Sequence, residues 1–377
     1  MTQFSPFDEA AMRRALELAA RGLYSTYPNP RVGAVLARDD EIVGEGGHET
    51  PGQAHAEPNA IRNAGERARG ATAYVTLEPC SHHGRTPPCV DALLAAGVRR
   101  VVYAIGDPDP RVNGRGARLL ADAGVAVESG LMAREAEALN AGFLMRLRKG
   151  RPFVRLKSAA SLDGRTALAN GASKWITSEE ARADVQHWRA QSGAILTSAA
   201  TVLADDPRLD VRIEAPQQPL RVVLDRRRQL RKGAKILRPP GEVLLFAAAG
   251  KRPAKPGRKT IAERLGAARI ERVRVARGHL DLGRVLQRLG ELQINDVLVE
   301  AGPRLSGALL SAGLVDEWIL YLAPKLLGPQ AKPLAAIARL TKMAAAPQFE
   351  LLDSATVGTD MRLRLRLRPR SRPGTRK

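Results

Sequence analysis

The sequence predicts two α/β domains in which helices cover layers of β-strands. Three observations support this fold class. Apolar runs of strand length alternate with helix-like segments along the chain, this alternation is interrupted once near position 150, and 377 residues exceed the usual length of one domain. The hydrophobic fraction of 44% is sufficient for globular cores, and glycine and proline are not concentrated in a repeat or low-complexity tract.

The first domain is expected over residues 1–149. Alanine, methionine and leucine at helical spacing predict a helix over Asp8–Arg21, and Gly22 stands where such a helix would end. A closing helix is predicted over Arg134–Arg148. Short apolar runs predict strands, separated by helices, at Val32–Leu36, Ala73–Leu77 and Val98–Ile105.

The second domain is expected over residues 150–368, because Gly150, Arg151 and Pro152 interrupt the helical pattern before a new strand begins. Apolar runs predict its strands at Phe153–Lys157, Ala194–Thr197, Arg221–Leu224, Val243–Phe246, Arg272–Val275, Asp296–Glu300 and Glu317–Ala323. Two Pro-containing stretches are expected to form surface loops, at residues 214–219 and 250–259.

The C-terminal end carries a large part of the net charge of +21. Eight basic residues and no acidic one lie between Arg362 and Lys377, so 21 − 8 leaves +13 for the other residues. Arginine alternating with apolar residues over Met361–Arg368 predicts a half-buried edge strand with a solvated charged face. Residues 369–377 are expected to form a basic tail. A nucleic-acid-binding arm is the alternative interpretation.

The chain is expected to be cytoplasmic and to have no membrane partner. No apolar run is long enough to span a bilayer, and Asp8 and Glu9 lie where a signal peptide would be apolar. The two cysteines, Cys80 and Cys89, cannot form a disulfide framework in so long a chain. Their position in the sequence therefore matters more than their number.

The order His55-Ala-Glu57, then Pro79-Cys80, then Cys89 is typical of zinc-dependent deaminases. Imidazole nitrogen and thiolate sulfur are preferred zinc ligands, and three protein ligands leave the fourth tetrahedral position for a water of lowered pKa. Glu57 follows His55 by two residues, so it can face this water and carry a proton to the departing amine. The pattern predicts one zinc ion, held by His55, Cys80 and Cys89, with Glu57 as the catalytic residue.

Two other interpretations of these residues are weighed. A disulfide between Cys80 and Cys89 is disfavoured in a reducing compartment. In a purely structural zinc site, His82 or His83 would supply the fourth ligand, but this would leave Glu57 without a role. Pro58 is a departure from the usual pattern, although proline is tolerated in the first turn of a helix.

The spacing of the two cysteines and several longer blocks give a more specific resemblance. The chain is similar to the bifunctional deaminase–reductases of riboflavin biosynthesis over residues 6 to about 368. In the first half the resemblance rests on Tyr27–Gly33, Glu78–Cys89 and Asp107–Gly116. In the second half it rests on Lys157–Thr166, Ser173–Thr177, Ala194–Pro207 and Val299–Pro303.

For the first domain, the resemblance implies a three-layer cytidine-deaminase-like fold. Its activity would be the zinc-dependent hydrolytic deamination of 2,5-diamino-6-ribosylamino-4(3H)-pyrimidinone 5′-phosphate. Asn29 would lie in the pyrimidine pocket, and Arg85 would contact the substrate. Asp109 stands where many members of the family have asparagine.

For the second domain, the resemblance implies a dihydrofolate-reductase-like α/β fold that uses NADPH to reduce the ribosyl group, giving 5-amino-6-ribitylaminouracil 5′-phosphate. No G-x-G-x-x-G pattern follows a predicted strand, which argues against a Rossmann site. The NADPH site would be formed by Ala159, Trp175, Thr201, Asp205, Arg226 and Gly302, Pro303, Arg304, Leu305, Ser306, Gly307 and Ala308. The substrate would meet Lys157, Ser173, Arg189, Leu209, Arg212 and Glu300.

Residues 302–308 also have a physical reason to bind phosphate. They follow a predicted strand and open an apparent helix, whose free N–H groups and dipole favour an anion. Arg226 departs from the serine that is frequent at its position in the family.

Two competing functions remain open at this point. A nucleic-acid base deaminase with a basic accessory domain would need aromatic stacking surfaces, but only 4% of residues are aromatic. A non-enzymatic regulator would not need the complete set of zinc and proton-transfer residues. The preferred interpretation is an enzyme acting on a small phosphorylated pyrimidine, without a nucleic-acid partner, and the resemblance implies a homo-oligomer, a dimer.

Overall fold

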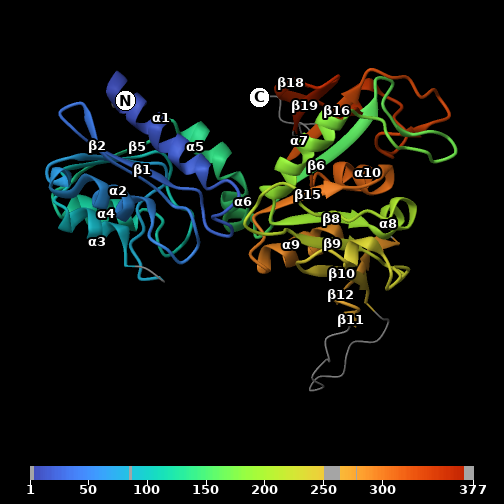
Figure 1. Cartoon of the computed structure of the whole chain (residues 1–377), viewed down its shortest axis with the longest axis horizontal. Helices are drawn as coiled ribbons and strands as arrows, with labels where there is room; N and C mark the ends of the chain where they lie inside the picture. The colour runs from blue at the N-terminus through green and yellow to red at the C-terminus, as the bar shows by residue number, and fades with distance from the viewer. Residues whose placement is uncertain (1–3, 85–86, 250–263, 277, 369–377) are drawn as a thin grey trace, which may run out of the picture. The chain divides into compact units, whose positions relative to one another are not determined.

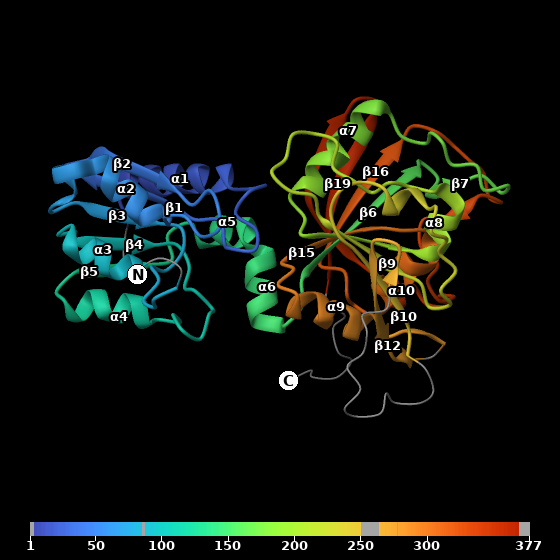
Figure 2. The same ribbon diagram turned by 60° about the horizontal axis from the view of Figure 1, so that its bottom comes forward.

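The chain separates after Gly150 into two units, Met1–Gly150 and Arg151–Lys377, which are described one at a time (Figures 1 and 2). The computed structural model describes residues 4–84, 87–249, 264–276 and 278–368. Arg85, the predicted loop at 250–259 and the predicted tail at 369–377 lie outside these residues. In the described part of the chain, no helix is long and apolar enough to cross a membrane.

The first unit contains a five-stranded sheet in the order β2-β1-β3-β4-β5 (Figure 1). Strand β1 is antiparallel to both of its neighbours, whereas β3, β4 and β5 are parallel. The strands are β1 (Gly33–Arg38), β2 (Glu41–Gly47), β3 (Thr72–Val75), β4 (Arg100–Tyr103) and β5 (Ala126–Ser129).

Helices cover both faces of this sheet, which confirms the three-layer prediction. Helices α1 and α5 lie on one face and α2, α3 and α4 on the other (Figure 1). The helices are α1 (Pro6–Arg21), α2 (Ala56–Ala64), η1 (Gly65–Ala68), α3 (Cys89–Ala95), α4 (Arg115–Asp122), α5 (Ala133–Leu139) and α6 (Ala141–Lys149). Helix α1 begins at Pro6 because the side chains of Ser5 and Asp8 form a capping box.

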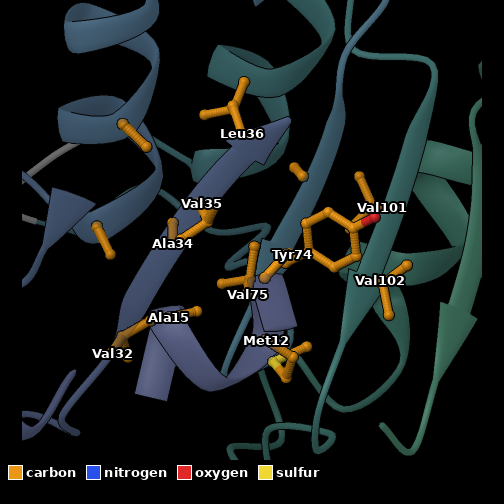
Figure 3. Close-up of a cluster of buried hydrophobic side chains, with 14 of the residues drawn as sticks. Met12, Ala15, Val32, Ala34, Val35, Leu36, Tyr74, Val75, Val101 and Val102 are labelled. Atoms are coloured by element: carbon orange, nitrogen blue, oxygen red, sulfur yellow. The ribbon is translucent and has the colours of Figure 1, made fainter. Parts of the chain in front are cut away.

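Small residues bring the helices unusually close to the sheet. A Cβ atom on Gly33 would lie 1.9 Å from the carbonyl oxygen of Ala15 in α1, and one on Gly46 would lie 2.3 Å from that of Ala56 in α2. The side chains between them, including Met12, Val35 and Val75, are completely buried (Figure 3). The start of α2 is therefore fixed against strand β2, and this helix start carries the proposed metal site.

The second unit is built on a ten-stranded sheet in the order β11-β12-β10-β9-β8-β15-β6-β16-β19-β18. Strands β12 to β16 in this order are parallel, and β11, β19 and β18 continue the sheet in antiparallel fashion. The strands are β6 (Phe153–Ser161), β8 (Ala194–Ser198), β9 (Leu220–Leu224), β10 (Val243–Ala248), β11 (Arg264–Leu265), β12 (Ala268–Val273), β15 (Asp296–Glu300), β16 (Glu317–Ala323), β18 (Phe349–Val357) and β19 (Asp360–Leu367).

Two short two-stranded sheets and several helices complete this unit. The short sheets pair β7 (Arg165–Ala167) with β17 (Lys332–Pro333) and β13 (Val275–Ala276) with β14 (His279–Leu280). The helices are α7 (Glu179–Ala190), α8 (Ala199–Asp205), η2 (Lys235–Leu237), α9 (Leu282–Glu291), α10 (Pro303–Ser311) and η3 (Met343–Ala345). Because α8 and α10 each follow a parallel strand, their N-termini start at the carboxyl edge of the sheet, where α/β proteins bind ligands.

Three element predictions are wrong in detail. The helix predicted over Arg134–Arg148 is split into α5 and α6 at Asn140, whose buried side chain hydrogen-bonds the backbone N–H and C=O of Arg31. The strand predicted at Arg272–Val275 is instead β12, which runs from Ala268 to Val273.

The third concerns the alternating segment Met361–Arg368. It forms β19, but this strand lies inside the sheet between β16 and β18 rather than at its edge. Its arginines are also not simply solvated, since Arg362 pairs with Asp184 at 3.0 Å and Arg364 pairs with the buried Glu317. The arginines are stabilised by acidic partners far away in the sequence, and the alternating pattern could not reveal them.

Candidate active sites

The start of α2 positions two of the predicted deaminase residues. His55 is the N-cap residue of α2 and Glu57 lies in its first turn, where its side chain is buried at 4% exposure. Pro58 follows within the same turn, where a missing backbone N–H removes no intrahelical hydrogen bond. The departure at Pro58 is therefore compatible with an undistorted helix start.

The two cysteines converge on His55 from a loop and from a second helix start. Cys80 lies in the loop after β3, and Cys89 is the first residue of α3. The Nδ1 atom of His55 lies 3.2 Å from Sγ of Cys89 and 3.5 Å from Sγ of Cys80. Both cysteines are free thiols, so the disulfide alternative is not adopted.

These three side chains fit a zinc ion. The imidazole nitrogen and the two sulfurs all lie within 4.8 Å of one another. Tetrahedral zinc with ordinary bond lengths would separate nitrogen from sulfur by about 3.6 Å and the two sulfurs by about 3.8 Å. Among the described residues, neither His82 nor His83 belongs to the cluster, so the structural-zinc alternative finds no fourth ligand. The donor set matches a site with one open position.

The surroundings adjust the acidity of these groups. Burial raises the pKa of Glu57 to about 7, and the neighbouring Cys80 thiolate adds to this effect. A hydrogen bond from Cys89, together with the His55 ring and the backbone N–H of Cys89, lowers the pKa of the Cys80 thiol to about 4. A carboxyl group that titrates near neutrality beside a thiolate is suited to exchange protons at this site.

Asn29 is held close to this cluster through a histidine that the sequence interpretation did not select. Its Nδ2 atom donates to Nε2 of His48 at 3.0 Å, and Nδ1 of His48 donates to the carbonyl oxygen of Ala54 at 3.1 Å. The rings of His48 and His55 meet edge to face, with centroids 5.3 Å apart. The only signal for His48 in the sequence is its short distance from His55.

Asp109 lies in a loop that is anchored to the cysteine-bearing segment. Its carboxylate accepts hydrogen bonds from the backbone and side chain of Arg111, and these lower its pKa. Glu78, also not selected from the sequence, accepts hydrogen bonds from the backbone N–H groups of Asp107 and Gly114 in the same loop and of Ala117 in the first turn of α4. The loop that carries Asp109 is thus fixed beside Cys80.

In the second unit, the predicted substrate residues gather at the carboxyl ends of β6 and β15. Glu300 is paired in register with Lys157 on the neighbouring strand. Arg189 of α7 binds both carboxylate oxygens of Glu300, at 2.6 and 3.0 Å. Burial lowers the pKa of Lys157, whereas the positive charge of Arg189 helps keep the pKa of Glu300 low despite burial.

Other predicted substrate residues border this cluster. Arg189 also donates to the carbonyl oxygen of Asp210, next to Leu209, which adopts a left-handed backbone conformation. The positive charge of Arg212 also helps to lower the pKa of Glu300. Ser173 lies in the loop before α7. Since the guanidinium of Arg189 is occupied by Glu300 and Asp210, its contact to the substrate would be indirect.

The predicted NADPH residues lie along the same edge of the sheet. The backbone N–H of Gly302, at the N-cap of α10, lies 3.4 Å from the hydroxyl of Thr201 in α8. Asp205 ends α8, and Arg226 follows strand β9. The hydroxyl of Ser306 bonds the carbonyls of Ala301 and Gly302, so this side chain is used inside α10.

The remaining members are placed on or near β6. Ala159 lies on β6 two residues beyond Lys157. Trp175 is 63% exposed, with the guanidinium of Arg182 over its ring, and Lys325 donates to the carbonyls of Trp175 and Ile176. Gly307 lets helix α10 lie close to the backbone of Ala336, because a Cβ at position 307 would lie 2.1 Å from the carbonyl oxygen of Ala336. Pro303, Arg304, Leu305 and Ala308 belong to α10.

Fold and site together define a zinc-binding pyrimidine deaminase unit followed by a nucleotide-dependent reductase unit. Residues 5–105 match the model of the cytidine and deoxycytidylate deaminase zinc-binding region, and residues 152–363 match the RibD C-terminal domain. The chain belongs to the RibD family of riboflavin biosynthesis proteins, and it is a bifunctional deaminase and reductase that uses zinc and NADPH.

Individual relatives agree over nearly the whole chain. The riboflavin biosynthesis protein RibD of Escherichia coli K12 is 53% identical over 95% of this chain and 99% of its own, and that of Haemophilus influenzae is 46% identical over 96% and 98%. The structure of Acinetobacter baumannii RibD (form 1) is 49% identical, with a TM-score of 0.86 over 96% of this chain and 99% of its own. A deaminase/reductase from Thermotoga maritima is 33% identical, with a TM-score of 0.83 over 96% and 99%.

Proposed function

We propose that the first unit deaminates 2,5-diamino-6-ribosylamino-4(3H)-pyrimidinone 5′-phosphate with His55, Cys80 and Cys89 as zinc ligands. The observation that carries this proposal is the convergence of the three donor atoms within 4.8 Å beside a buried Glu57. The solved Thermotoga maritima relative is described as a diaminohydroxyphosphoribosylaminopyrimidine deaminase, which supports this substrate.

Deamination requires a proton to pass from the attacking water to the departing amine, and we assign this transfer to Glu57. Bound zinc supplies a Lewis acid that lowers the pKa of water. Water adds its oxygen to the ring carbon that carries the amino group, and ammonia leaves. Glu57 takes a proton from the water and returns it to the amine, because a buried carboxyl of pKa about 7 can both accept and donate near neutral pH. Asn29 and the loop carrying Asp109 orient the pyrimidine.

The second unit would reduce the ribosyl group of the deaminated product. The cofactor supplies the hydride, and the chain aligns the nicotinamide with the sugar carbon and excludes water. Lys157, half-buried on the strand next to Glu300, is placed to hold a proton toward the reacting sugar oxygen. The NADPH pyrophosphate would lie at the N-terminus of α10, near Gly302 and Thr201.

A paired assay tests both assignments. Zinc content is measured on the purified chain, ammonia release is followed with the diaminopyrimidinone, and NADPH absorbance is followed with the deaminated product. We expect about one zinc per chain and both activities. A chain that contains zinc but releases no ammonia would refute the deaminase assignment, and unchanged NADPH absorbance with the deaminated product would refute the reductase assignment.

Self-association as a dimer is proposed from the family resemblance and is supported by one sheet face of the second unit. Residues directly opposite one another on β16, β19 and β18 share a face. On the face that bears Trp318, these are Leu365 and Leu351, and Leu351 is 57% exposed. An apolar sheet face of this kind suits a second copy of the chain. Sedimentation velocity of wild type and Leu351→Glu tests it, with a dimer converting to monomer as the expected result.

The cytoplasm is the proposed compartment, since two free cysteines that serve as metal ligands require reducing conditions.

A further inference from the structure

Tyr321 lies beside Lys157, the residue proposed to hold the proton in the reductase site. Strand β6 runs between β15 and β16, and Lys157 is in register with Glu300 on β15 and with Ile319 on β16. Tyr321 stands two residues beyond Ile319, so its side chain lies on the same face of the sheet. The Nζ atom of Lys157 lies over the ring of Tyr321, 5.7 Å from the ring centroid. Lys157 is therefore flanked by one strand that carries a carboxylate and one that carries an aromatic ring.

The ring of Tyr321 is buried under helix α7. Only 1% of the residue is exposed, and it packs in one apolar cluster with Val185 and Trp188 of that helix. A side chain with so little exposed surface does not reach a substrate. Any effect of Tyr321 on the reaction therefore passes through the neighbours that it contacts, and Lys157 is the neighbour placed in the reductase site.

The hydroxyl of Tyr321 makes its ring a better partner for a cation. It donates to Oδ2 of Asp184, and Arg362 donates to both carboxylate oxygens of Asp184, at 3.2 and 3.0 Å. Linked hydrogen bonds polarise one another, so the phenol oxygen and its ring gain negative charge. Burial, and then this hydrogen bond, hold the pKa of Tyr321 well above its usual range. The phenol keeps its proton, and the negative face of the ring quadrupole is available to Lys157.

The charges around Lys157 give its ammonium form little support. Burial lowers the pKa of Lys157, the negative charge of Glu300 opposes this, and the positive charge of Arg189 lowers it again. Glu300 is itself neutralised, since the guanidinium of Arg189 binds both of its oxygens and Arg212 adds positive charge. The same face also carries charged residues that are paired with one another, namely Arg155, Asp296, Glu317 and Arg364. The ring of Tyr321 is thus a second source of attraction for the ammonium group.

We propose that Tyr321 is a positioning residue of the reductase reaction, whose ring face holds the ammonium group of Lys157 charged and oriented toward the substrate. The proposal rests on the proposed role of Lys157. Reduction of the ribosyl group adds one hydride, which the cofactor supplies, and one proton. A lysine that has lost its proton cannot deliver it. A ring centroid within about 6 Å is close enough to attract a cation, and the attraction is stronger where water is excluded.

The test changes the charge of the ring face while keeping the ring. NADPH oxidation with the deaminated substrate is measured from about pH 6 to 10 on the full-length zinc-loaded chain, because activity that needs protonated Lys157 falls as the pH rises through its pKa. The variants are Tyr321→Phe and a chain with 3,4,5-trifluorophenylalanine at position 321. Fluorine withdraws electrons from the ring face and weakens its attraction for a cation, while the ring keeps nearly the same shape.

We expect the alkaline fall of kcat to move to lower pH in the fluorinated chain, by about 0.4–1.5 relative to Tyr321→Phe. Tyr321→Phe itself should shift less from wild type, since it loses only the hydroxyl that Asp184 polarises. Leu320→Ala is the matched control for a change in the same strand. Leu320 is buried but lies on the opposite face of β16, so its pH profile should remain that of wild type.

A variant of the lysine separates the two levels of the proposal. Lys157→Met should lose most NADPH oxidation, and the alkaline fall with it. If it does, but the phenylalanine and trifluorophenylalanine chains have the same alkaline fall, the inference about Tyr321 is overturned and the reductase site stands. If Lys157→Met reduces the substrate with the pH profile of wild type, the role of Lys157 is refuted, and the inference with it.

Discussion

Glu78 accepts a hydrogen bond from the backbone N–H of Gly114 at 3.0 Å, although the two residues are 36 positions apart. Further N–H groups from Asp107 and Ala117 reach the same carboxylate, which is 3% exposed. Gly116 completes the attachment, since a Cβ there would lie 2.1 Å from the carbonyl oxygen of Pro79. The segment that enters Cys80 and the loop that carries Asp109 are therefore joined by these contacts.

Glu78→Gln tests this attachment. The amide keeps the size of the side chain but turns one acceptor into a donor that faces backbone N–H groups. We expect kcat/KM of deamination to fall about 10- to 100-fold, mainly through a higher KM, because the pyrimidine is less well positioned. Zinc content should stay unchanged. Glu66→Gln, at an exposed position of the same unit, is the matched control. An unaltered KM in Glu78→Gln would show that the loop needs no such anchor.

Glu57→Gln separates metal binding from proton transfer. The variant retains all three proposed zinc ligands but cannot shuttle a proton, so ammonia release should fall by about 10²- to 10⁴-fold while zinc content remains that of wild type. NADPH oxidation with the already deaminated substrate should be unaffected. Deamination that survives in this variant would remove Glu57 from the mechanism.

Arg189→Ala and Arg189→Lys examine the reductase cluster. The guanidinium of Arg189 holds both oxygens of Glu300, and neither side chain is more than 14% exposed. Removing one partner of such a buried pair costs about 3–5 kcal/mol. We expect Arg189→Ala to lose most NADPH oxidation, and Arg189→Lys to recover part of it, since lysine restores the charge without the paired geometry.

The deaminase reaction provides the control for this pair of variants. Ammonia release should remain at the wild-type rate in both, because Arg189 belongs to the second unit. Equal loss of the two activities would indicate general unfolding or coupled sites rather than a local role of Arg189.

Residues that belong to a recognisable spacing motif could be predicted, even where the motif joins distant segments, and residues outside any motif could not. His55 and Glu57 lie in one helix turn, and Cys80 and Cys89 flank one loop, so their spacing alone predicts the metal chemistry. His48 contacts Asn29, 19 positions away, and Glu78 binds Gly114 and Ala117, 36 and 39 positions away, and no period or motif marks either residue. Their roles depend on which strands become neighbours.

The same limit explains the strand that was placed wrongly at an edge. The alternation of Met361–Arg368 correctly predicts a strand with two unlike faces. Its place in the sheet depends on pairing with β16 and β18, and the charge of Arg364 is matched by Glu317, 47 residues earlier. An arginine on a strand indicates a solvent-exposed face only where the fold places no buried carboxylate beside it.

Asp8 should make the first unit sensitive to acid. Its carboxylate is 5% exposed; burial by itself raises the pKa, but hydrogen bonds from Arg100, Tyr74 and the Ser5 N–H outweigh this and hold the pKa well below its usual range. The ordinary value, about 3.9, applies to the unfolded chain. The stabilisation is therefore fully present above about pH 4 and is lost as the pH falls toward the folded value.

Asp8→Asn removes this pH dependence while keeping the size of the side chain. We expect the variant to be less stable than wild type by about 2–4 kcal/mol at pH 7, because Arg100 loses one of its two charged partners. The difference should shrink as the pH is lowered below about 4, where wild-type Asp8 begins to lose its advantage. Urea unfolding followed by circular dichroism between pH 7 and 3 measures it, and loss of zinc at low pH affects both proteins alike. A difference that stays constant over this range would mean that the Asp8 carboxylate is not held ionised by Arg100 and Tyr74.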